Sequence, residues 1–496
     1  MEAVPESQFT EPVPASSCRR GRAPAIFFQA RTLAPALMAG LALRLWLLKD
    51  LFLVNGDSLV YGGLAVTLLH GRYGLDQAGG AIVPTLIRLP GYPLFLALCF
   101  GIFGKENYFA AVLVQIALEL LGCLLLADFA ARIAPPRLKS GARIATLWLA
   151  ALCPFTASYS VLPLAEAPTL FVVALALWAM ARFLDLPNWA SALWFTFALT
   201  FAAFLRPDGV LVAAALAPAL LLGLLRGHAA ASIPLKSLAR MALVCTLLVL
   251  APFAAWTWRN WRTFHVFQPL APRYAVDPGQ QIYPGWQRWV KTWCLDFVST
   301  YQVYWPVPGS PLKLSELPDR AFDSPAQYEE TAALASKYND RDNASDILPD
   351  VDQGFARLAE RRIDAHPLRY YLWLPLGRLA DMWLRPRVEN LNIDLDWWVY
   401  AHHNAETRFS WAYAGLNAFY LVLGAVGLWL RPRFWKAMLA YLLLRSALLL
   451  TVEAPETRYT LEAFPMLFAL GGVALYWMVN WVRLSVTKLN ASPGRR

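Results

Sequence analysis

Residues 32–74, TLAPALMAGLALRLWLLKDLFLVNGDSLVYGGLAVTLLHGRYG, place a long apolar run directly before an acid and a second, shorter apolar stretch. The run at 32–53 has about the length that crosses a bilayer. Asp57 follows at the expected membrane edge, and the small residues after it would let a helix pack closely. The stretch therefore predicts a membrane-spanning helix followed by a juxtamembrane helix.

The whole chain has the composition of a polytopic membrane protein. Of its 496 residues, 58% are hydrophobic and 16% are charged, and the mean hydropathy is +0.41. A soluble domain usually carries about 25% charged residues. Apolar runs of near-spanning length occur at 32–53, 107–130, 143–161, 164–183, 189–205, 209–225, 238–258, 409–430, 434–452 and 460–482. We expect an all-α polytopic membrane protein with about ten transmembrane helices.

The net charge of +10 indicates topology rather than a nucleic-acid partner. Lys and Arg gather in short clusters between the apolar runs, as the positive-inside rule predicts. On this pattern both termini are cytoplasmic, and the long segment between Arg259 and Phe409 is external. The six cysteines show no disulfide or metal-ligand spacing.

Five regions follow from this topology. They are a disordered cytoplasmic tail at 1–31, a transmembrane core at 32–258 with a first external loop at 54–106, an external loop domain at 259–408, C-terminal transmembrane helices at 409–482 and a cytoplasmic tail at 483–496. In the external domain, Ser324 should cap a helix that runs to about Tyr338. A second helix at about 353–365 should stop at His366 and Pro367, and 368–387 suits a helix in the headgroup plane.

Acids and arginines from distant segments reach the outer surface on this topology. They are Asp57, Arg88, Glu166, Arg206, Asp208, Arg259, Arg262, Glu453, Glu456 and Arg458. Charges at a lipid boundary are costly unless they are paired or used, so they mark a candidate site. Guanidinium groups suit a phosphate, and a carboxylate can take a proton from a hydroxyl. A polyprenyl-phosphate sugar is a substrate of this kind, with Asp57 as base and the arginines at its phosphate.

Several of these segments also resemble a known family. The acid after the first span, "LVYGGLAVTLLHGRYG", "RLPGYPLFLALCFGIFG", "LPLAEAP", "RPDG", "APFAAWTWRNWRTF" and "ETRYTLEAFP" resemble the GT-C superfamily of integral-membrane glycosyltransferases. The similarity is to the bacterial protein-mannosyltransferase-like and aminoarabinose-transferase-like branch, and covers about 40–270 and 366–480. It implies a polyprenyl-phosphate sugar donor, with Asp57 acting as or positioning the catalytic base. It also implies chemistry at the outer face of the bacterial inner membrane, or the lumenal face of the endoplasmic reticulum.

The site predicted from the residues and the resemblance together has three parts. Asp57 is the catalytic residue, Arg88, Arg259 and Arg458 bind the donor phosphate, and Glu166 is a second acid or metal ligand. Many family members carry two acids close together in the first loop, whereas Ser58 follows Asp57 here. No cofactor is therefore certain, a divalent metal is left open, and no metal ligands are assigned.

Each of these residues also has a purely structural interpretation. Asp57 could cap the next helix, and Arg88 could anchor the turn before a proline. Glu166 could cap a span, Arg259 could belong to an aromatic belt with solvated cations, and Arg458 could form a local ion pair with a neighbouring glutamate.

Two other polar groups allow similar alternatives. Gln115 and Glu119, one turn apart, should hydrogen-bond inside the bundle. Asp394 and Asp396 in "DLDWW" resemble the DxD of nucleotide-sugar enzymes, and His402 and His403 lie near enough for a metal site. The predicted external position argues against a nucleotide sugar, which is cytoplasmic.

The function predicted from the sequence is transfer of a monosaccharide, hexosyl or pentosyl, with inversion. The donor is a polyprenyl phosphate, the acceptor is a lipid, a glycan or a protein, and membrane lipid surrounds the site. The alternative is a membrane transporter or lipid flippase, a class that often shows internal repeats and charged, broken helices near the midplane. The sequence shows no repeat, and its charges gather at one surface. A receptor built on the external loop would not need so many spans.

Overall fold

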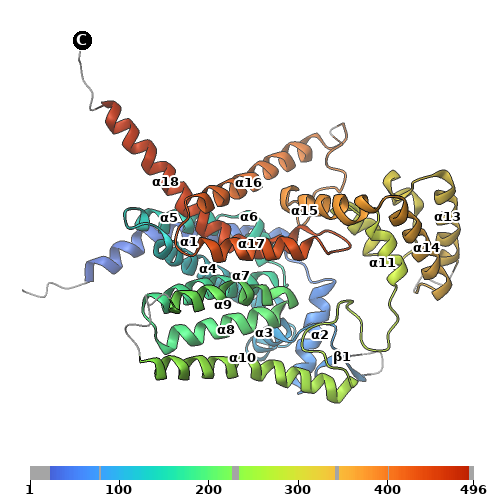
Figure 1. Ribbon diagram of the computed structural model, residues 1–496, viewed down its shortest axis with the longest axis horizontal. Coiled ribbons are helices and arrows are strands. Elements are labelled where there is room, and N and C mark those ends of the chain that lie inside the picture. Colours follow the sequence, from blue (N-terminus) through green and yellow to red (C-terminus); the bar gives the residue numbers. More distant parts are fainter. Residues whose placement is uncertain (1–22, 77–79, 226–233, 341–345, 400, 491–496) are drawn as a thin grey trace, which may run out of the picture.

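The computed structural model describes residues 23–76, 80–225, 234–340, 346–399 and 401–490, and these are mostly helical (Figure 1). The tail expected at 1–31 lies outside the described residues as far as residue 22. From there helix α1 (Ala23–Leu51) begins, earlier than the apolar run that predicts it. Of the expected C-terminal tail, 491–496 also lies outside the described residues.

The segment after α1 contains two short helices and a two-stranded sheet. Helix α2 (Asp57–Leu69) is followed by strands β1 (Gly74–Asp76) and β2 (Ile82–Pro84), which pair antiparallel with Leu75 opposite Val83, and then by helix α3 (Gly91–Phe103). A Cβ at Gly74 would lie 2.3 Å from the carbonyl oxygen of Val83, so glycine permits this close pairing. The sheet departs from the all-α expectation.

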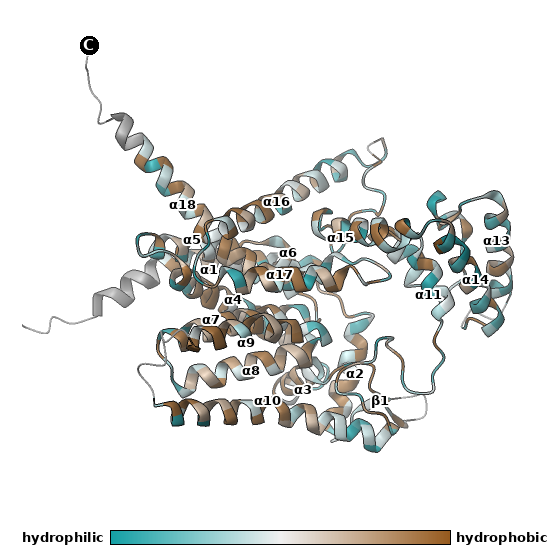
Figure 2. Cartoon of the chain, viewed as in Figure 1, coloured by the Kyte–Doolittle hydropathy of each residue, from teal (hydrophilic) through white to brown (hydrophobic). Residues whose placement is uncertain are grey.

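The remaining bundle consists of mostly apolar helices, some short and some long (Figure 2). They are α4 (Tyr108–Ile133), α5 (Lys139–Ala151), α6 (Pro154–Ser160), α7 (Glu166–Asp185), α8 (Trp189–Leu205), α9 (Val210–Leu225), α10 (Leu235–Phe264), α16 (Asn404–Trp429), α17 (Trp435–Leu449) and α18 (Phe464–Asn490). The run expected at 143–161 is divided at Pro154, which begins α6. Among the described residues, seven helices are long and apolar enough to cross a membrane. The expected count of ten is therefore not confirmed, but integral-membrane character is.

Burial within the bundle separates a central helix from a peripheral one. Most of α7 is buried, whereas most of α10 is exposed although it is strongly apolar. Leu243, Leu247 and Leu250 of α10 are each more than half exposed. A row of exposed leucines is stable where the surroundings are hydrocarbon, so we infer that this face of α10 contacts lipid.

Small residues let the inner helices approach closely. A Cβ at Gly472 of α18 would lie 2.7 Å from the backbone nitrogen of Thr146 in α5. A Cβ at Gly427 of α16 would lie 2.3 Å from the carbonyl oxygen of Leu470 in α18. Close backbone contact of this kind is the usual basis of helix association in membranes, where burial of apolar surface from water contributes little.

The segment between α10 and α16 forms a second hydrophobic core at one end of the bundle (Figure 1). Its helices are α11 (Pro284–Lys291), α12 (Phe297–Ser299), α13 (Pro325–Asn339), α14 (Pro349–Ala365) and α15 (Leu374–Leu384), with single helical turns at Thr300–Tyr304, Leu314–Glu316, Asp319–Ala321 and Arg369–Trp373. Trp286, Trp289 and Trp293 pack in this core beside Phe355. This part is much more hydrophilic than the bundle (Figure 2).

The predicted start of the first helix in this domain and the predicted end of the second are confirmed, whereas the second helix begins at Pro349, four residues earlier than expected. Ser324 is the N-cap of α13, and its hydroxyl accepts a hydrogen bond from the backbone N–H of Gln327 at 3.3 Å. The Gln327 side chain in turn accepts from the backbone N–H of Asp323 at 3.1 Å. Helix α14 ends at Ala365, directly before His366 and a proline.

The expected headgroup-plane helix at 368–387 consists of a π-helical turn followed by α15, with Tyr371 and Trp373 largely exposed. Two of its arginines instead bond to the domain between α10 and α16. Arg369 forms a two-pronged pair with Asp323 at 2.7 and 2.8 Å, and Arg378 is fully buried. Arg378 donates to the backbone carbonyls of Lys291 and Cys294 in the domain between α10 and α16. These arginines therefore fasten the segment to the domain.

A cluster of ion pairs joins helix ends far from this domain. Arg132 of α4 bonds Asp128 and Asp185, both at 2.7 Å, and Arg143 of α5 bonds Asp128 at 2.8 Å. Arg433, in the turn between α16 and α17, also pairs with Asp185. The three arginines come from clusters that the charge pattern assigns to one side of the membrane, and the structure brings them together.

Candidate functional site

A continuous network of charged side chains connects six segments of the chain. Its members are Asp57, Arg88, Glu166, Arg206, Asp208, Arg445, Glu456, Arg458 and Glu462. Seven of the nine belong to the set that the sequence topology assigns to one membrane surface. Groups that are distant in the sequence therefore converge, as expected for residues that share one membrane surface.

Asp57 lies at the start of α2, between two arginines. Its Oδ1 accepts from Arg88 Nη2 at 2.7 Å, and its Oδ2 lies 3.5 Å from Arg458 Nη1. The N-cap of α2 is Gly56, and no side chain caps that end. The capping role considered for Asp57 is therefore not what this carboxylate does here.

The charge of Asp57 is strongly favoured by these neighbours. Burial alone would raise its pKa, but the guanidinium groups of Arg88 and Arg458 outweigh burial and hold the pKa of this carboxyl below its ordinary value of 3.8. Asp57 and Arg88 are 30% and 25% exposed, so both can still reach a ligand. The carboxylate is thus ionised at neutral pH and accessible.

Arg458 connects Asp57 to the acids of the last segment and of α7. Its Nη1 lies 3.7 Å from Glu166, and its Nε bonds Glu456 at 2.5 Å. The local pair predicted for "ETRY" is therefore present, as part of the network. Glu166, the first residue of α7, is almost fully buried and also bonds Arg206 at 3.1 Å.

A deeper layer of the network involves two residues that the sequence analysis missed. Arg445 of α17 is fully buried and bonds Asp208 at 2.6 Å and Glu462 at 2.8 Å. Arg206 bonds Glu462 at 2.7 Å from the other side. Both Arg445 and Glu462 stand inside apolar runs, where an ionisable residue is rare and marks a site or a buried pair. That signal could have identified them.

Arg259 does not join this network. Its guanidinium donates to the carbonyl oxygens of Thr85 at 2.8 Å and Tyr73 at 2.6 Å, and lies over the ring of Trp256. The Tyr73 hydroxyl donates in turn to the carbonyl oxygen of Arg88 at 3.0 Å. Arg259 therefore braces the loop that carries Arg88. Its neighbour on the helix, Arg262, is exposed.

Gln115 and Glu119 both form hydrogen bonds inside the bundle, as predicted, each with its own partners. Gln115 accepts from the Tyr92 hydroxyl at 3.1 Å and donates to two backbone carbonyls. Glu119 accepts from Arg44 Nε at 2.6 Å. Both arrangements are structural.

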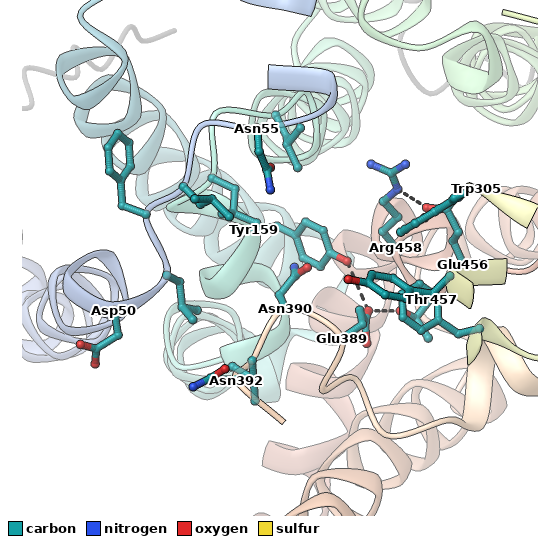
Figure 3. A pocket seen from close by; sticks show the side chains of 18 of the residues that line it. Asp50, Asn55, Tyr159, Trp305, Glu389, Asn390, Asn392, Glu456, Thr457 and Arg458 are labelled. Atoms are coloured by element: carbon teal, nitrogen blue, oxygen red, sulfur yellow. Dashed lines mark hydrogen bonds and ion pairs between the residues drawn. The ribbon is translucent and has the colours of Figure 1, made fainter. Parts of the chain in front are cut away.

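A cavity of about 1080 Å³ opens beside the network (Figure 3). Arg458 and Glu456 contribute to one wall, Asn55 to another, and the domain between α10 and α16 adds aromatic side chains. The lining from that domain and the adjoining segment is Phe297, Tyr301, Trp305, Glu389, Asn390 and Asn392. Aromatic rings, amides and carboxylates together can stack on a sugar ring and bond its hydroxyls.

Glu389, which also lines the cavity, is a further residue that the sequence did not identify. Its Oε1 accepts from Tyr159 at 3.2 Å and from Thr457, whereas Oε2 has no hydrogen-bond partner among the described residues (Figure 3). Burial raises the pKa of this carboxyl, although Arg387 opposes the effect. Nothing in "RVENLN" distinguishes this glutamate from a surface residue.

The acids of the network do not fit a divalent metal. Asp57 faces two guanidinium groups, and Glu166 faces Arg206 and Arg458. These guanidinium groups would repel a metal cation, and they already occupy the carboxylate oxygens that would bind it. The second-acid role of Glu166 remains compatible with this geometry, whereas a metal-ligand role is not supported.

Residues 84–256 match a family model. Its description is dolichyl-phosphate-mannose-protein mannosyltransferase. The matched segment runs from β2 into α10 and includes Arg88, Glu166 and Arg206. The resemblance to GT-C glycosyltransferases predicted from the sequence is thereby confirmed over this part of the chain.

No curated protein matches the chain. One solved structure is similar to it, the crystal structure of ArnT from Cupriavidus metallidurans bound to undecaprenyl phosphate. The TM-score is 0.37 and the sequence identity 17%, over 91% of this chain and 77% of that chain.

Proposed function

We propose that this protein is a glycosyltransferase that moves a monosaccharide, with inversion, from a polyprenyl phosphate to a hydroxyl acceptor. The observation that carries the proposal is the position of Asp57. It is an accessible carboxylate held between Arg88 and Arg458, and Arg458 also lines a cavity large enough for a sugar and its acceptor. The family match over 84–256 supports the same chemistry.

The reaction assigns one task to each kind of group. Asp57 takes the proton from the acceptor hydroxyl as that oxygen bonds to the anomeric carbon of the sugar. The bond from the anomeric carbon to the phosphate oxygen breaks at the same time, and the polyprenyl phosphate leaves with the electron pair. Arg88 and Arg458 stabilise the negative charge that develops on the phosphate.

The two arginines also explain how a carboxylate with a low pKa can act as a base. In the free protein their charges favour ionised Asp57 and make it a weak base. A phosphate that binds Arg88 and Arg458 competes for the same N–H donors. The donor therefore raises the basicity of Asp57 when the acceptor proton has to be removed.

The cavity wall is proposed to recognise the sugar and the acceptor. Trp305 and Tyr301 offer rings to a sugar face, and Glu389 and Asn390 offer polar atoms that have no hydrogen-bond partner among the described residues. Arg259 acts on the donor phosphate only indirectly, by holding the loop of Arg88. Hexosyl and pentosyl donors, and lipid, glycan and protein acceptors, are all compatible with this wall.

The site is proposed to lie at the outer face of the bacterial inner membrane, with both termini in the cytoplasm. The basic clusters after α4 and after α16 gather at the bundle end away from the external domain. The first turns of α1 and the last turns of α18 also project from that end (Figure 1). Basic residues concentrate on the cytoplasmic side of membrane proteins.

The test is transfer from lipid-linked sugars by the full-length protein in lipid nanodiscs. A panel of polyprenyl-phosphate monosaccharides, hexosyl and pentosyl and labelled in the sugar, is incubated with the protein and a membrane extract as acceptor. We expect at least one donor to lose its label to the extract, and Asp57→Asn to abolish this transfer. Asp76→Asn, an exposed acid of the same loop, should retain it.

Two results would contradict the proposal. One is near-normal transfer by a folded Asp57→Asn protein, checked by its gel-filtration profile. The other is movement of intact lipid-linked sugar between leaflets without loss of the label, which would favour the flippase alternative.

A further inference from the structure

The segment that links α15 to α16 brings a histidine among three carboxylates. His403 Nδ1 lies 3.4 Å from Asp394 Oδ2 and 4.0 Å from Glu406 Oε2. One ligand atom from each of Asp394, His403 and Glu406 lies within 4.8 Å of the other two. His402, its neighbour in the sequence, is exposed.

These separations are close to those of a metal ligand set. Zinc binds histidine nitrogen and carboxylate oxygen at about 2.0–2.2 Å, so two ligands of a tetrahedral ion stand about 3.3–3.5 Å apart. The distance from His403 Nδ1 to Asp394 Oδ2 already meets this value, and Glu406 Oε2 lies about half an ångström further from Nδ1 than a shared ion requires.

The other ring nitrogen of His403 is held by a third acid. Nε2 lies 3.2 Å from Asp396 Oδ1, on the opposite side of the ring from Asp394 and Glu406. A carboxylate in this place accepts the N–H of Nε2 and leaves the lone pair of Nδ1 for a metal. This arrangement of carboxylate, histidine and metal is the usual one around protein zinc ions.

The charges of the cluster favour a cation. Three carboxylates meet here, and His403 is the one basic group among the described residues that lies within ion-pair distance of them. Glu406 receives one further bond, from the backbone N–H of Asp394 at 3.0 Å, which turns its carboxylate towards the cluster.

We propose that Asp394, His403 and Glu406 bind a divalent transition metal, zinc by the chemistry of the ligands, with Asp396 orienting the histidine. The proposal does not depend on the transferase reaction. Its consequence is local, because the metal joins the first turn of α16 to Asp394. Asp394 lies two residues after Asn392, which lines the cavity. The metal would thus fix the position of that wall.

The test uses cobalt as a spectroscopic probe of the full-length protein. The detergent-solubilised protein is stripped with a chelator, dialysed and titrated with Co²⁺, whose visible absorption reports nitrogen and oxygen ligation, and then with Zn²⁺ to displace it. We expect one equivalent of bound cobalt that zinc displaces. His403→Ala should weaken binding by more than about 100-fold, and Asp396→Asn by about 10- to 100-fold.

His402→Ala is the matched control, because it removes an adjacent histidine that faces solvent. It should bind cobalt as the unmodified protein does. Glu406→Gln provides a second ligand variant in case His403→Ala fails to fold, and gel filtration checks both. The proposal is overturned if the unmodified protein binds no cobalt, or if His402→Ala weakens binding as much as His403→Ala.

Discussion

Replacing Arg88 by Gln should change both the rate of the proposed transfer and its dependence on pH. Arg88 donates to Asp57 at 2.7 Å, and its charge lowers the pKa of that carboxyl more than any other charge does. Without this guanidinium, burial is opposed by Arg458 alone, so the pKa of Asp57 rises. The variant also loses one donor to the departing phosphate.

The size of both effects can be worked from the contact. Charges about 4 Å apart interact by about 4 kcal/mol at an effective dielectric constant of 20. Because both side chains are a quarter to a third exposed, we take roughly half of this value, about 2 kcal/mol, which corresponds to about 1.5 pH units. Loss of a donor to an anionic transition state costs about 10²- to 10³-fold in rate.

The sign of the pH effect follows from the lowered pKa. Ionised Asp57 is present at any pH above its folded-state pKa, which lies below 3.8, and is lost as the pH falls through that value. The acid limb of kcat/KM should therefore lie below about pH 4 in the unmodified protein. In Arg88→Gln it should move upward by about one to two pH units, with a lower plateau.

The assay is the initial rate of label transfer from the preferred donor, measured across pH for three variants. Arg88→Lys keeps the charge and should show the smaller displacement of the acid limb. Arg72→Gln, an exposed arginine of the same loop, should match the unmodified protein. An acid limb that stays in place in Arg88→Gln would show that this arginine does not set the pKa of the base, and a plateau within about threefold of normal would remove it from the phosphate site.

Four further changes test other parts of the structure. Arg445→Met leaves Asp208 and Glu462 with only Arg206 as a shared cationic partner, and the resulting excess of negative charge should lower the free energy of unfolding by about 3–5 kcal/mol, measured by denaturation in detergent. Ser324→Ala removes the cap of α13 and should cost about 1 kcal/mol, seen as faster amide exchange in its first turn. Gly472→Ala forces α18 away from α5 and should lower the melting temperature. Arg259→Gln should reduce transfer less than Arg88→Gln, because it acts only through the loop.

The sequence predicted which charged groups share a side, because run lengths and basic clusters fix the direction of each span. Asp57, Arg88, Glu166 and Arg458 accordingly meet in one network. It could not predict distances within that side. Arg259 and Arg88 look alike in the sequence, and only the packing of α10 on the first loop turns Arg259 towards backbone carbonyls.

Two physical reasons explain why Arg445 and Glu389 were not predicted from the sequence. Arg445 lies in a run that is apolar enough to resemble an ordinary membrane span, although a lone arginine in such a run requires buried partners. Glu389 follows an irregular segment with no helical or strand period, so its contact with Tyr159 depends entirely on the tertiary fold. The short strands at 74–76 and 82–84 likewise gave too little alternation to be recognised.

The ion pairs at both ends of the bundle limit how its helices can move. Rocking one half against the other, as alternating access demands, would break the buried contacts of Arg445 and of Arg206 at one end. It would also separate Arg132 and Arg433 from Asp185 at the other. A bundle held by ion pairs at both ends has no hinge about which its two halves could rotate to pass cargo across the membrane. We therefore expect substrates to reach a fixed site, with any opening and closing confined to the loops beside it.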